Sequence, residues 1–233
     1  MTRVLALLTA AWLAAFGVAP PAPSATAPEL APYRALARNR ADSEGVLAAA
    51  RLGLGMALGD AEPPPVLRVP EWPGSPRPVY VTLVRGRTSR ACVGSDSPLG
   101  GSLAATLSRL GERLADADLR RPPVRAEELD TLRLVVAFSS DPVPVRDPMT
   151  VDPAREGLRI ETERGAVAFL PGEARTIGWA LREARRIGVV VTGVSGASGA
   201  SGASGAVSYS RFTVVTLSGP ATSKSRRTSV VSP

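Results

Sequence analysis

The sequence of 233 residues contains no histidine, one cysteine and one lysine, and only 4% of its residues are aromatic. Without histidine, Ser-His-Asp and Cys-His catalysis and histidine-ligated zinc or iron sites, as usually built, are excluded. The single cysteine, Cys92, excludes Cys-x-x-Cys metal sites, redox pairs and intramolecular disulfides. The sequence therefore predicts no metal and no cofactor, and a core built mostly from Leu, Val and Ala.

The formal net charge is +7, and almost all of the positive charge is arginine. This imbalance is better explained by a GC-rich coding bias than by a function. A basic surface could favour acidic partners or anionic lipid. The arginines are scattered, however, and no basic run is interleaved with aromatic residues, which argues against a nucleic-acid partner.

The N-terminal segment has the pattern of a secretory signal peptide. Arg3 precedes an apolar stretch from Val4 to Val18, and small residues and prolines follow. This stretch is too short and wrongly flanked for a stable membrane span. We expect a signal peptide over residues 1–27, with an uncleaved N-terminal anchor as the alternative. No cysteine follows the apolar stretch, so the predicted protein is secreted or periplasmic, without a lipid anchor and without a membrane span after cleavage.

Apolar spacing indicates a helical region over residues 35–58, with a second helix capped by Asp42 or Ser43. Residues 28–42 are expected to form a linker. Gly53, Gly55 and Gly59 resemble a dinucleotide loop only weakly, because helical residues and not a strand precede them. We interpret these glycines as a site of close helix packing or a helix end.

Further along the chain, strands and helices mix without strict alternation of strand and helix, and two hairpins are clear. The pattern predicts about six strands in an α+β fold with antiparallel sheets. Residues 195–206 repeat Gly-Ala-Ser and predict a flexible insert, and residues 219–233 predict a disordered basic tail. The expected elements are strands at 79–84, 89–93 and 131–139, a hairpin within 157–174, a strand at 208–217, and helices within 98–119, 126–129 and 176–188.

Several motifs in order resemble the AMMECR-type domain family, over residues 43–218. Its hallmark hexapeptide Leu-Arg-Gly-Cys-Ile-Gly matches residues 89–94, and its Asp-Pro-Arg-Phe-Pro-Pro turn matches residues 118–123. The other matches are Glu127-Glu128-Leu129, the apolar strand from Leu132 to Pro142, Gly157-Leu158, Leu170-Pro171, and Tyr209 to Phe212. This chain departs from the hexapeptide at Ser89 and Ala91, where the family has Leu and Gly.

The resemblance implies two subdomains with antiparallel sheets flanked by helices, facing each other across a cleft. The larger subdomain would come from both ends of the chain, and the smaller, over roughly residues 99–155, would be inserted between them. The hexapeptide would lie on a strand at their interface. A large partner such as a protein has been suggested for the cleft of such proteins, whose biochemical activity is unsettled.

Two functions are consistent with these residues. In the first, the cleft around Ser89, Arg90, Ala91, Cys92, Val93 and Gly94 binds a protein or peptide without catalysis. In the second, Cys92 is the catalytic residue of a thiol-dependent enzyme. On a regular strand Arg90 would share a face with Cys92 and lower the pKa of the thiol, whereas a buried Cys92 would act as a small apolar residue.

The missing histidine and the altered hexapeptide favour the non-enzymatic hypothesis, and no feature of the sequence sets an oligomeric state. Two acidic pairs, Asp116 with Asp118 and Glu127 with Glu128, are alternative candidates for acid–base chemistry or magnesium binding. A solvated face or helix-start acids explain each pair better.

Overall fold

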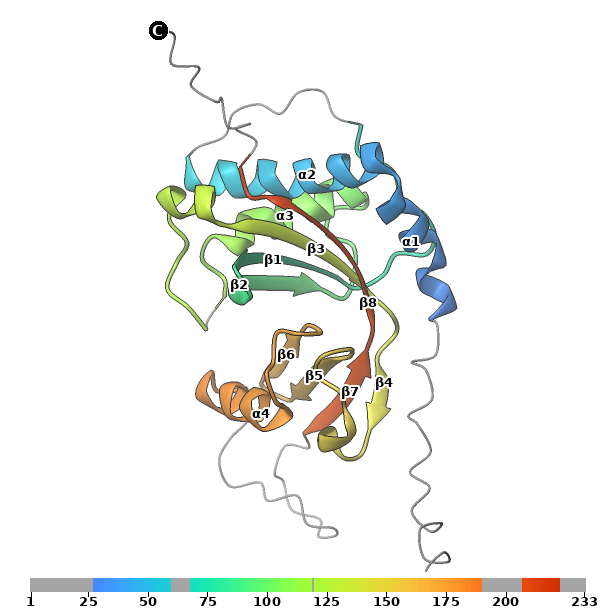
Figure 1. Ribbon diagram of the computed structural model, residues 1–233, viewed down its shortest axis with the longest axis vertical. Helices are drawn as coiled ribbons and strands as arrows, with labels where there is room; N and C mark the ends of the chain where they lie inside the picture. The colour runs from blue at the N-terminus through green and yellow to red at the C-terminus, as the bar shows by residue number, and fades with distance from the viewer. Residues whose placement is uncertain (1–26, 60–67, 119, 190–206, 223–233) are drawn as a thin grey trace, which may run out of the picture.

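The computed structural model describes residues 27–59, 68–118, 120–189 and 207–222. It has an α+β fold in which two four-stranded antiparallel sheets lie one above the other, with helices on their outer sides (Figure 1). The α+β prediction is confirmed. The Gly-Ala-Ser insert at 195–206, residues 1–26 of the expected signal peptide and residues 223–233 of the tail lie outside the described residues.

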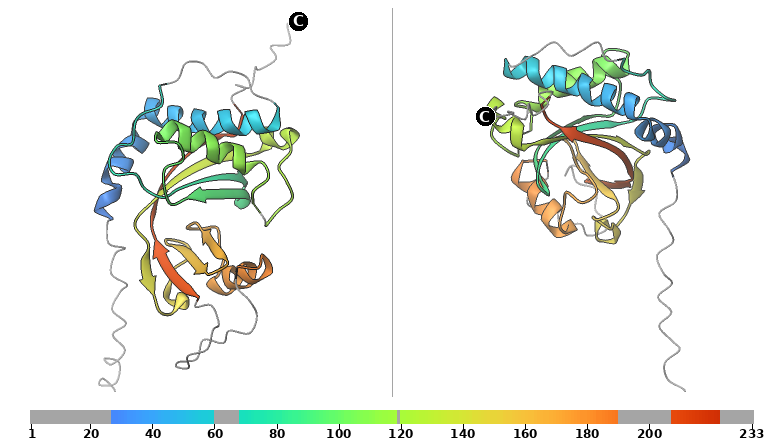
Figure 2. Two further views of the ribbon diagram at one scale, coloured as in Figure 1. Left: turned by 180° about the vertical axis from the view of Figure 1, so that it is seen from behind. Right: turned by 45° about the horizontal axis from the view of Figure 1, so that its top comes forward.

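The first sheet has the strand order β2-β1-β3-β8. Helices α2 and α3 cover one of its faces, and the other face is turned toward the second sheet (Figures 1 and 2). The apolar core lies between this sheet and the helices, as expected from the leucines repeated along α3. The elements are β1 (Val79–Arg85), β2 (Thr88–Ser95), β3 (Arg133–Ser139), β8 (Val214–Pro220), α2 (Arg40–Leu58), α3 (Leu103–Leu114) and a 3-10 helix η2 (Ala126–Thr131).

Two glycines let α2 and α3 approach closely. A Cβ atom on Gly53 would collide with the carbonyl of Ser108 in α3, and one on Gly111 would collide with the carbonyl of Ala50 in α2. Gly59 ends α2 with a φ of 70°, in the left-handed region that favours glycine. The structure therefore confirms helix packing and a helix end, and not a dinucleotide loop, at these positions.

The prediction of a linker over residues 28–42 is wrong. These residues form a 3-10 helix η1 (Pro28–Leu30), the helix α1 (Ala31–Arg38) and the start of α2. Leu30, Tyr33 and Leu36 recur every three residues and are buried in the first core, which holds the segment against the domain. Asn39, and not Asp42 or Ser43, caps α2, because its side chain accepts hydrogen bonds from two backbone N–H groups.

The second sheet has the strand order β4-β7-β5-β6 and is formed entirely by residues 143–212. The smaller subdomain therefore differs from the range 99–155 expected from the sequence, because α3 packs on α2 and belongs to the first core. Helix α4 covers the second sheet with a small core of its own. The elements are β4 (Val143–Val145), η3 (Pro148–Thr150), β5 (Gly157–Thr162), β6 (Gly165–Phe169), α4 (Ile177–Arg186) and β7 (Ser208–Phe212).

The chain passes between the two sheets at Ser140 and again at Thr213. The N–H of Ser140 donates to the carbonyl of Thr213 over 2.9 Å, and the N–H of Thr213 donates to Ser140 Oγ over 3.1 Å. The single strand expected over 208–217 is thus divided at Thr213 and shared by both sheets. The predicted tail also begins later than residue 219, because β8 continues to Pro220 and Ala221 is buried.

Candidate functional site

Cys92 lies on the edge strand β2, at the boundary between the two halves of the molecule. It packs against an apolar cluster formed by Tyr80, Ala137, Leu170 and Phe212, which joins the two sheets. Its sulfur also lines a cavity of about 240 Å³, together with residues of β5 and β6. The sequence-based expectation that this residue lies between two sheets therefore agrees with the geometry.

The environment of Cys92 opposes ionisation of its thiol. Burial raises the pKa of the thiol to about 12, and the negative charge of Glu173 adds to this effect, while Arg120 opposes it. Thr82 Oγ1 donates a hydrogen bond to the sulfur over 3.2 Å. At neutral pH the group is therefore a neutral thiol, and not the nucleophilic thiolate that an enzyme of this kind needs.

Arg90 does not lie beside the sulfur, contrary to the expectation from strand alternation. The β1–β2 ladder pairs Leu83 with Ala91 and Val84 with Ser89, so that Arg90 is an extra residue in a bulge. A bulge breaks the alternation of faces, and the guanidinium turns to another partner. It makes two hydrogen bonds to the carboxylate of Glu128, of 2.7 and 2.9 Å.

Arg90 holds the loop between α3 and η2 against its own strand. Its guanidinium also donates to the carbonyls of Pro122 and Pro123, each over 3.0 Å. The hydrogen bond from Arg90 lowers the pKa of Glu128 to about 2, which keeps this carboxylate charged. Glu128 is therefore the ion-pair partner of Arg90. Glu127 and Glu128, the second acidic pair singled out from the sequence, do not form an acid–base pair.

The remaining residues of the hexapeptide segment divide between the core and the cleft. Ala91 and Val93 are buried in the first core, and Val93 also contributes to the lining of the smaller cavity. Gly94 lines the smaller cavity, and a Cβ atom there would collide with the ring of Tyr80. Ser89 lines a second, larger cavity. Of the six residues singled out from the sequence, Ser89, Cys92, Val93 and Gly94 therefore line a cavity, whereas Arg90 and Ala91 do not.

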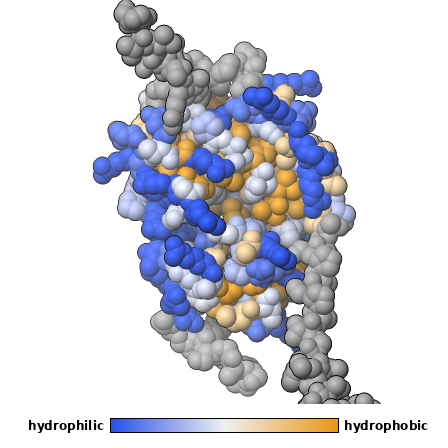
Figure 3. All heavy atoms as spheres, viewed as in Figure 1, coloured by the Kyte–Doolittle hydropathy of each residue, from blue (hydrophilic) through white to orange (hydrophobic). Residues whose placement is uncertain are grey.

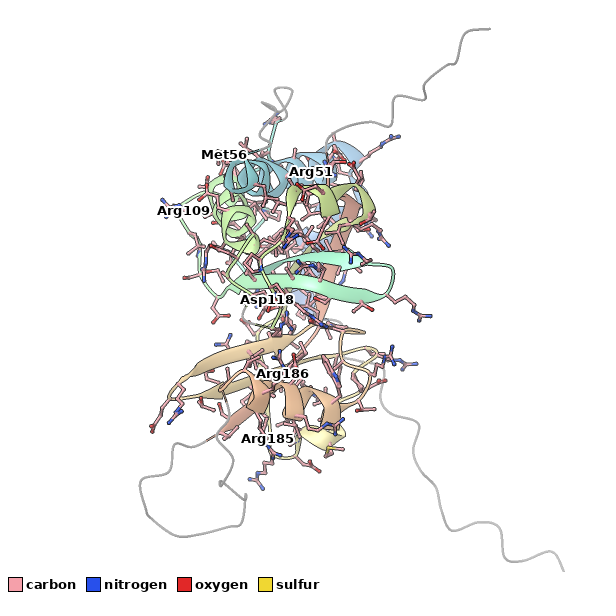
Figure 4. The ribbon with its side chains drawn as sticks, turned by 90° about the vertical axis from the view of Figure 1, so that its left-hand side faces the viewer. Arg51, Met56, Arg109, Asp118, Arg185 and Arg186 are labelled. Atoms are coloured by element: carbon pink, nitrogen blue, oxygen red, sulfur yellow. The ribbon has the colours of Figure 1, made fainter. Side chains whose placement is uncertain are left out.

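A buried charged group is formed by Asp118, Arg120 and Glu173. Of these residues the sequence singled out only Asp118, as an alternative acid–base or magnesium candidate. Arg120 Nε donates to Asp118 Oδ1 over 2.9 Å, and Arg120 Nη1 donates to Glu173 Oε1 over 2.7 Å. The side chains of Arg120, Asp118 and Glu173 are only 9%, 6% and 7% exposed. Because Asp118 belongs to the first half and Glu173 to the second, this bridge joins the two subdomains. Figure 4 shows Asp118 at the level where the two halves meet.

Asp118 also organises the edge of β2. Its Oδ2 atom accepts a hydrogen bond from the backbone N–H of Cys92 over 2.8 Å. Burial alone would raise the pKa of Asp118, but the hydrogen bonds and charge of Arg120 outweigh it and hold this pKa below its ordinary value. The interpretation of Asp118 as part of a solvated face is therefore wrong. The Asp-x-Arg spacing inside the family-like turn was the signal for this pair, although nothing in it points to Glu173.

Two further contacts close the boundary. Arg159 on β5 donates to Asp96, at the end of β2, over 2.6 Å. The rings of Tyr80 and Phe212, one from each half, stack with their centroids 5.8 Å apart. Tyr80, Asp96 and Arg159 line the smaller cavity, so contacts between the two halves border this cavity as well as the Asp118–Arg120 pair.

A larger cavity of about 590 Å³ lies on the other side of the Asp118–Arg120 pair. Its lining comes from the β1–β2 turn and the start of β2, the loop after α3, the segment that leads into α4, and α4 itself. Figure 3 shows hydrophilic residues gathered along the left side of both halves, where these segments lie. The lining residues are Arg87, Thr88, Ser89, Asp118, Arg120, Arg121, Gly172, Glu173, Arg175, Trp179 and Glu183.

Within the described ranges, no group of three or more Cys, Asp and Glu side chains is arranged to hold a metal ion. None of the described helices is long and apolar enough to cross a membrane. Neither Asp116 with Asp118 nor Glu127 with Glu128 forms a pair of free carboxylates, since Asp118 and Glu128 are each bound to arginine.

Two facing antiparallel sheets with a bridged cleft between them define an α+β protein of two subdomains. The AMMECR1 family model matches residues 47–216, and the chain belongs to the AMMECR1 family, whose function is uncharacterised. The fold is also that of the uncharacterised protein PH0010 from Pyrococcus horikoshii, which is 20% identical with a TM-score of 0.52. That match covers 78% of this chain and 93% of the other.

Curated relatives are similar over shorter segments. A protein of Thermococcus gammatolerans is 33% identical over 111 residues, covering 43% of this chain and 54% of the relative. A protein of Thermotoga maritima is 36% identical over 80 residues, covering 34% of this chain and 46% of the relative. A protein of Methanothermobacter thermautotrophicus is 30% identical over 113 residues, covering 46% of this chain and 58% of the relative. The chain thus spans about half the length of the curated relatives it matches.

Proposed function

We propose that this protein is a non-enzymatic binding domain whose cleft between the two subdomains holds a segment of a protein or peptide partner. The observation that carries the proposal is the larger cavity, which is lined by polar and charged side chains from both halves. Because its walls come from separate parts of the chain, a bound segment would contact both subdomains at once.

A partner would be recognised mainly by side chains at this site. An edge strand such as β2 offers backbone groups to which an extended peptide can add as a further strand. Here the outward N–H of Cys92 already donates to Asp118, and the loop held by Arg90 lies alongside. Strand addition at Cys92 would require these contacts to break, which favours docking into the cavity beside them.

The alternative, a thiol-dependent enzyme, has less support. Cys92 does line a cavity, but its thiol has a pKa raised to about 12 by burial, and the nearest charged groups include two carboxylates. With no histidine in the chain, no ordinary general base can deprotonate it. A partner is to be sought among secreted or periplasmic proteins if the predicted signal peptide acts as one.

The proposal can be tested by blocking the cleft. Thr88 is exposed on the edge strand β2 and lines the larger cavity, and Thr216 is exposed on the opposite edge strand, β8. Short random peptides displayed on phage are selected on the full-length protein and then titrated against Thr88→Trp and Thr216→Trp. We expect selected peptides to lose about tenfold or more in affinity with Thr88→Trp and less than about twofold with Thr216→Trp.

Equal binding to the two variants, or a selection that yields no peptide with a Kd below about 1 mM, would overturn the proposal. A third variant, Ala166→Trp, places the same bulk in the smaller cavity, which Ala166 lines from β6. Loss of binding with this variant as well would show that the bound segment extends past the Asp118–Arg120 bridge.

A further inference from the structure

Three arginines at the larger cavity lack a carboxylate partner within the described part of the chain. Arg87 lies in the β1–β2 turn, Arg121 in the loop after α3, and Arg175 just before α4. All three are exposed, and none makes a salt bridge with a described residue. Three segments that are distant in the sequence therefore bring unpaired positive charge to one cavity.

The other arginines at this boundary are all paired. Arg90 binds Glu128, Arg120 binds Asp118 and Glu173, and Arg159 binds Asp96. Arg186 of α4 binds Glu183 and also donates to the carbonyl of Arg120 (Figure 4). These arginines thus each have a carboxylate partner, whereas Arg87, Arg121 and Arg175, which line the larger cavity, form no salt bridge with a described residue.

Two further residues at the same cavity, Ser89 and Trp179, could contact a bound partner. The Ser89 hydroxyl is buried and has no hydrogen-bond partner among the described residues, although it lines the cavity. A buried polar atom without a partner is costly, and a bound acceptor or donor would relieve that cost. Trp179 also lines the cavity and is half-buried, with its ring in a T-shaped contact with Phe169, so it adds aromatic surface to this wall.

We propose that the larger cavity recognises an acidic peptide segment, whose Asp or Glu side chains pair with Arg87, Arg121 and Arg175. This inference rests on the proposed function and specifies its partner. Guanidinium groups bind carboxylates through two parallel hydrogen bonds, and convergent positive charge speeds the approach of an acidic partner.

The lining favours a peptide over a nucleic acid. Asp118, Glu173 and Glu183 also line the cavity. These carboxylates would repel a continuous phosphate backbone, which places negative charge at every nucleotide. A peptide carries backbone N–H donors as well as acidic side chains, so it can complement both signs of charge.

The test uses two synthetic peptides of equal length, one with alternating Glu and Gly and one with Gln in place of Glu, each carrying a fluorophore. Binding to the full-length protein is followed by fluorescence anisotropy. We expect the Glu peptide to bind, the Gln peptide to bind at least about tenfold more weakly, and the affinity for the Glu peptide to fall as salt is added.

A matched pair of triple variants separates the cavity from net charge. One variant combines Arg87→Gln, Arg121→Gln and Arg175→Gln. The control combines Arg38→Gln, Arg113→Gln and Arg185→Gln, which removes the same charge from exposed arginines outside the cavity. We expect the first variant to weaken binding of the Glu peptide about tenfold or more, and the control to weaken it less than about twofold.

Equal weakening by both variants would mean that only net charge attracts the peptide, and would overturn the inference. Tighter binding of a single-stranded RNA of equal charge than of the Glu peptide would overturn it in favour of a nucleic acid. Phage-selected peptides that lose affinity with Thr88→Trp but contain no acidic residues would remove the acidic class and leave the binding domain itself standing.

Discussion

The first sheet rests on a long apolar core between itself and helices α1, α2 and α3, whereas the second sheet has a far smaller core beneath the single helix α4. A small core stabilises a sheet weakly by itself. The second half gains support from the boundary instead, through Arg120 with Glu173, Arg159 with Asp96, and the stacked rings of Tyr80 and Phe212. The walls of the cleft therefore also stabilise the smaller half.

The largest expected effect follows from removing the central cation. Arg120→Ala would leave the buried carboxylates of Asp118 and Glu173 without a positive partner, which typically costs about 3–5 kcal/mol of unfolding free energy. We expect the loss to appear in urea unfolding, and hydrogen exchange to increase first in β5, β6 and α4. The matched control is Arg182→Ala, an exposed arginine on α4.

The companion variant Asp118→Asn, Arg120→Met, Glu173→Gln replaces the charged group by neutral side chains of similar size. It should recover part of the lost stability, since no buried charge is left unpaired. A uniform rise in exchange over both sheets of Arg120→Ala would contradict the view that the boundary chiefly supports the second half.

A smaller and differently placed effect is expected from Arg90→Ala. This guanidinium binds Glu128 and the carbonyls of Pro122 and Pro123, all within the first half. Loss of charged hydrogen bonds of this kind costs about 1.5–3 kcal/mol. Hydrogen exchange should rise over residues 120–128 and stay unchanged in α4. Arg90→Lys should restore only part of the lost unfolding free energy, because an ammonium cannot form the two parallel hydrogen bonds that a guanidinium makes to a carboxylate. Increased exchange in α4 would show that Arg90 also supports the boundary.

Acid should lower the unfolding free energy, because the carboxylates in these contacts take up protons. Arg90 lowers the pKa of Glu128 from 4.5 to about 2, and Arg120 holds the pKa of Asp118 below its ordinary value despite burial. The unfolded state therefore binds more protons in this range, so stability is complete above about pH 4.5 and is lost as pH falls toward about 2. Urea unfolding over this range should show a shallower loss in Arg90→Ala. An identical slope in both proteins would contradict the assignment to Glu128.

The sequence predicted the elements of the first half well, because their patterns are local. The leucines of α3 and the paired strands 79–84 and 89–93 repeat with the period of the element that they form. The division of the molecule was harder to see. Residues 208–217 contain no Gly or Pro, and β-branched or aromatic residues lie on both sides of Thr213, so no turn signal marks the passage from one sheet to the other.

The candidate site was predictable only in part, for a related reason. Spacing placed Cys92 on a strand, and the resemblance placed that strand at the interface. The bulge at Arg90 leaves no trace in the sequence, so the expected pairing of Arg90 with the sulfur was wrong. The partner of Arg120, Glu173, lies 53 residues away, and no periodicity connects positions so distant.

The smallest effect is expected at Cys92 itself. Cys92→Ala removes one sulfur from an apolar cluster and should change the unfolding free energy by about 1 kcal/mol, with peptide binding unchanged. In the wild type, a thiol whose pKa is raised to about 12 by burial, against about 8.5 for an ordinary thiol, has roughly a thousandfold less thiolate at pH 8. Because Cys92 is partly exposed and lines a cavity, iodoacetamide should label the folded protein, but roughly a thousandfold more slowly than an ordinary free thiol. Rapid labelling of the folded protein would instead support thiol chemistry, and the lone cysteine would then be more than a small apolar residue between two sheets.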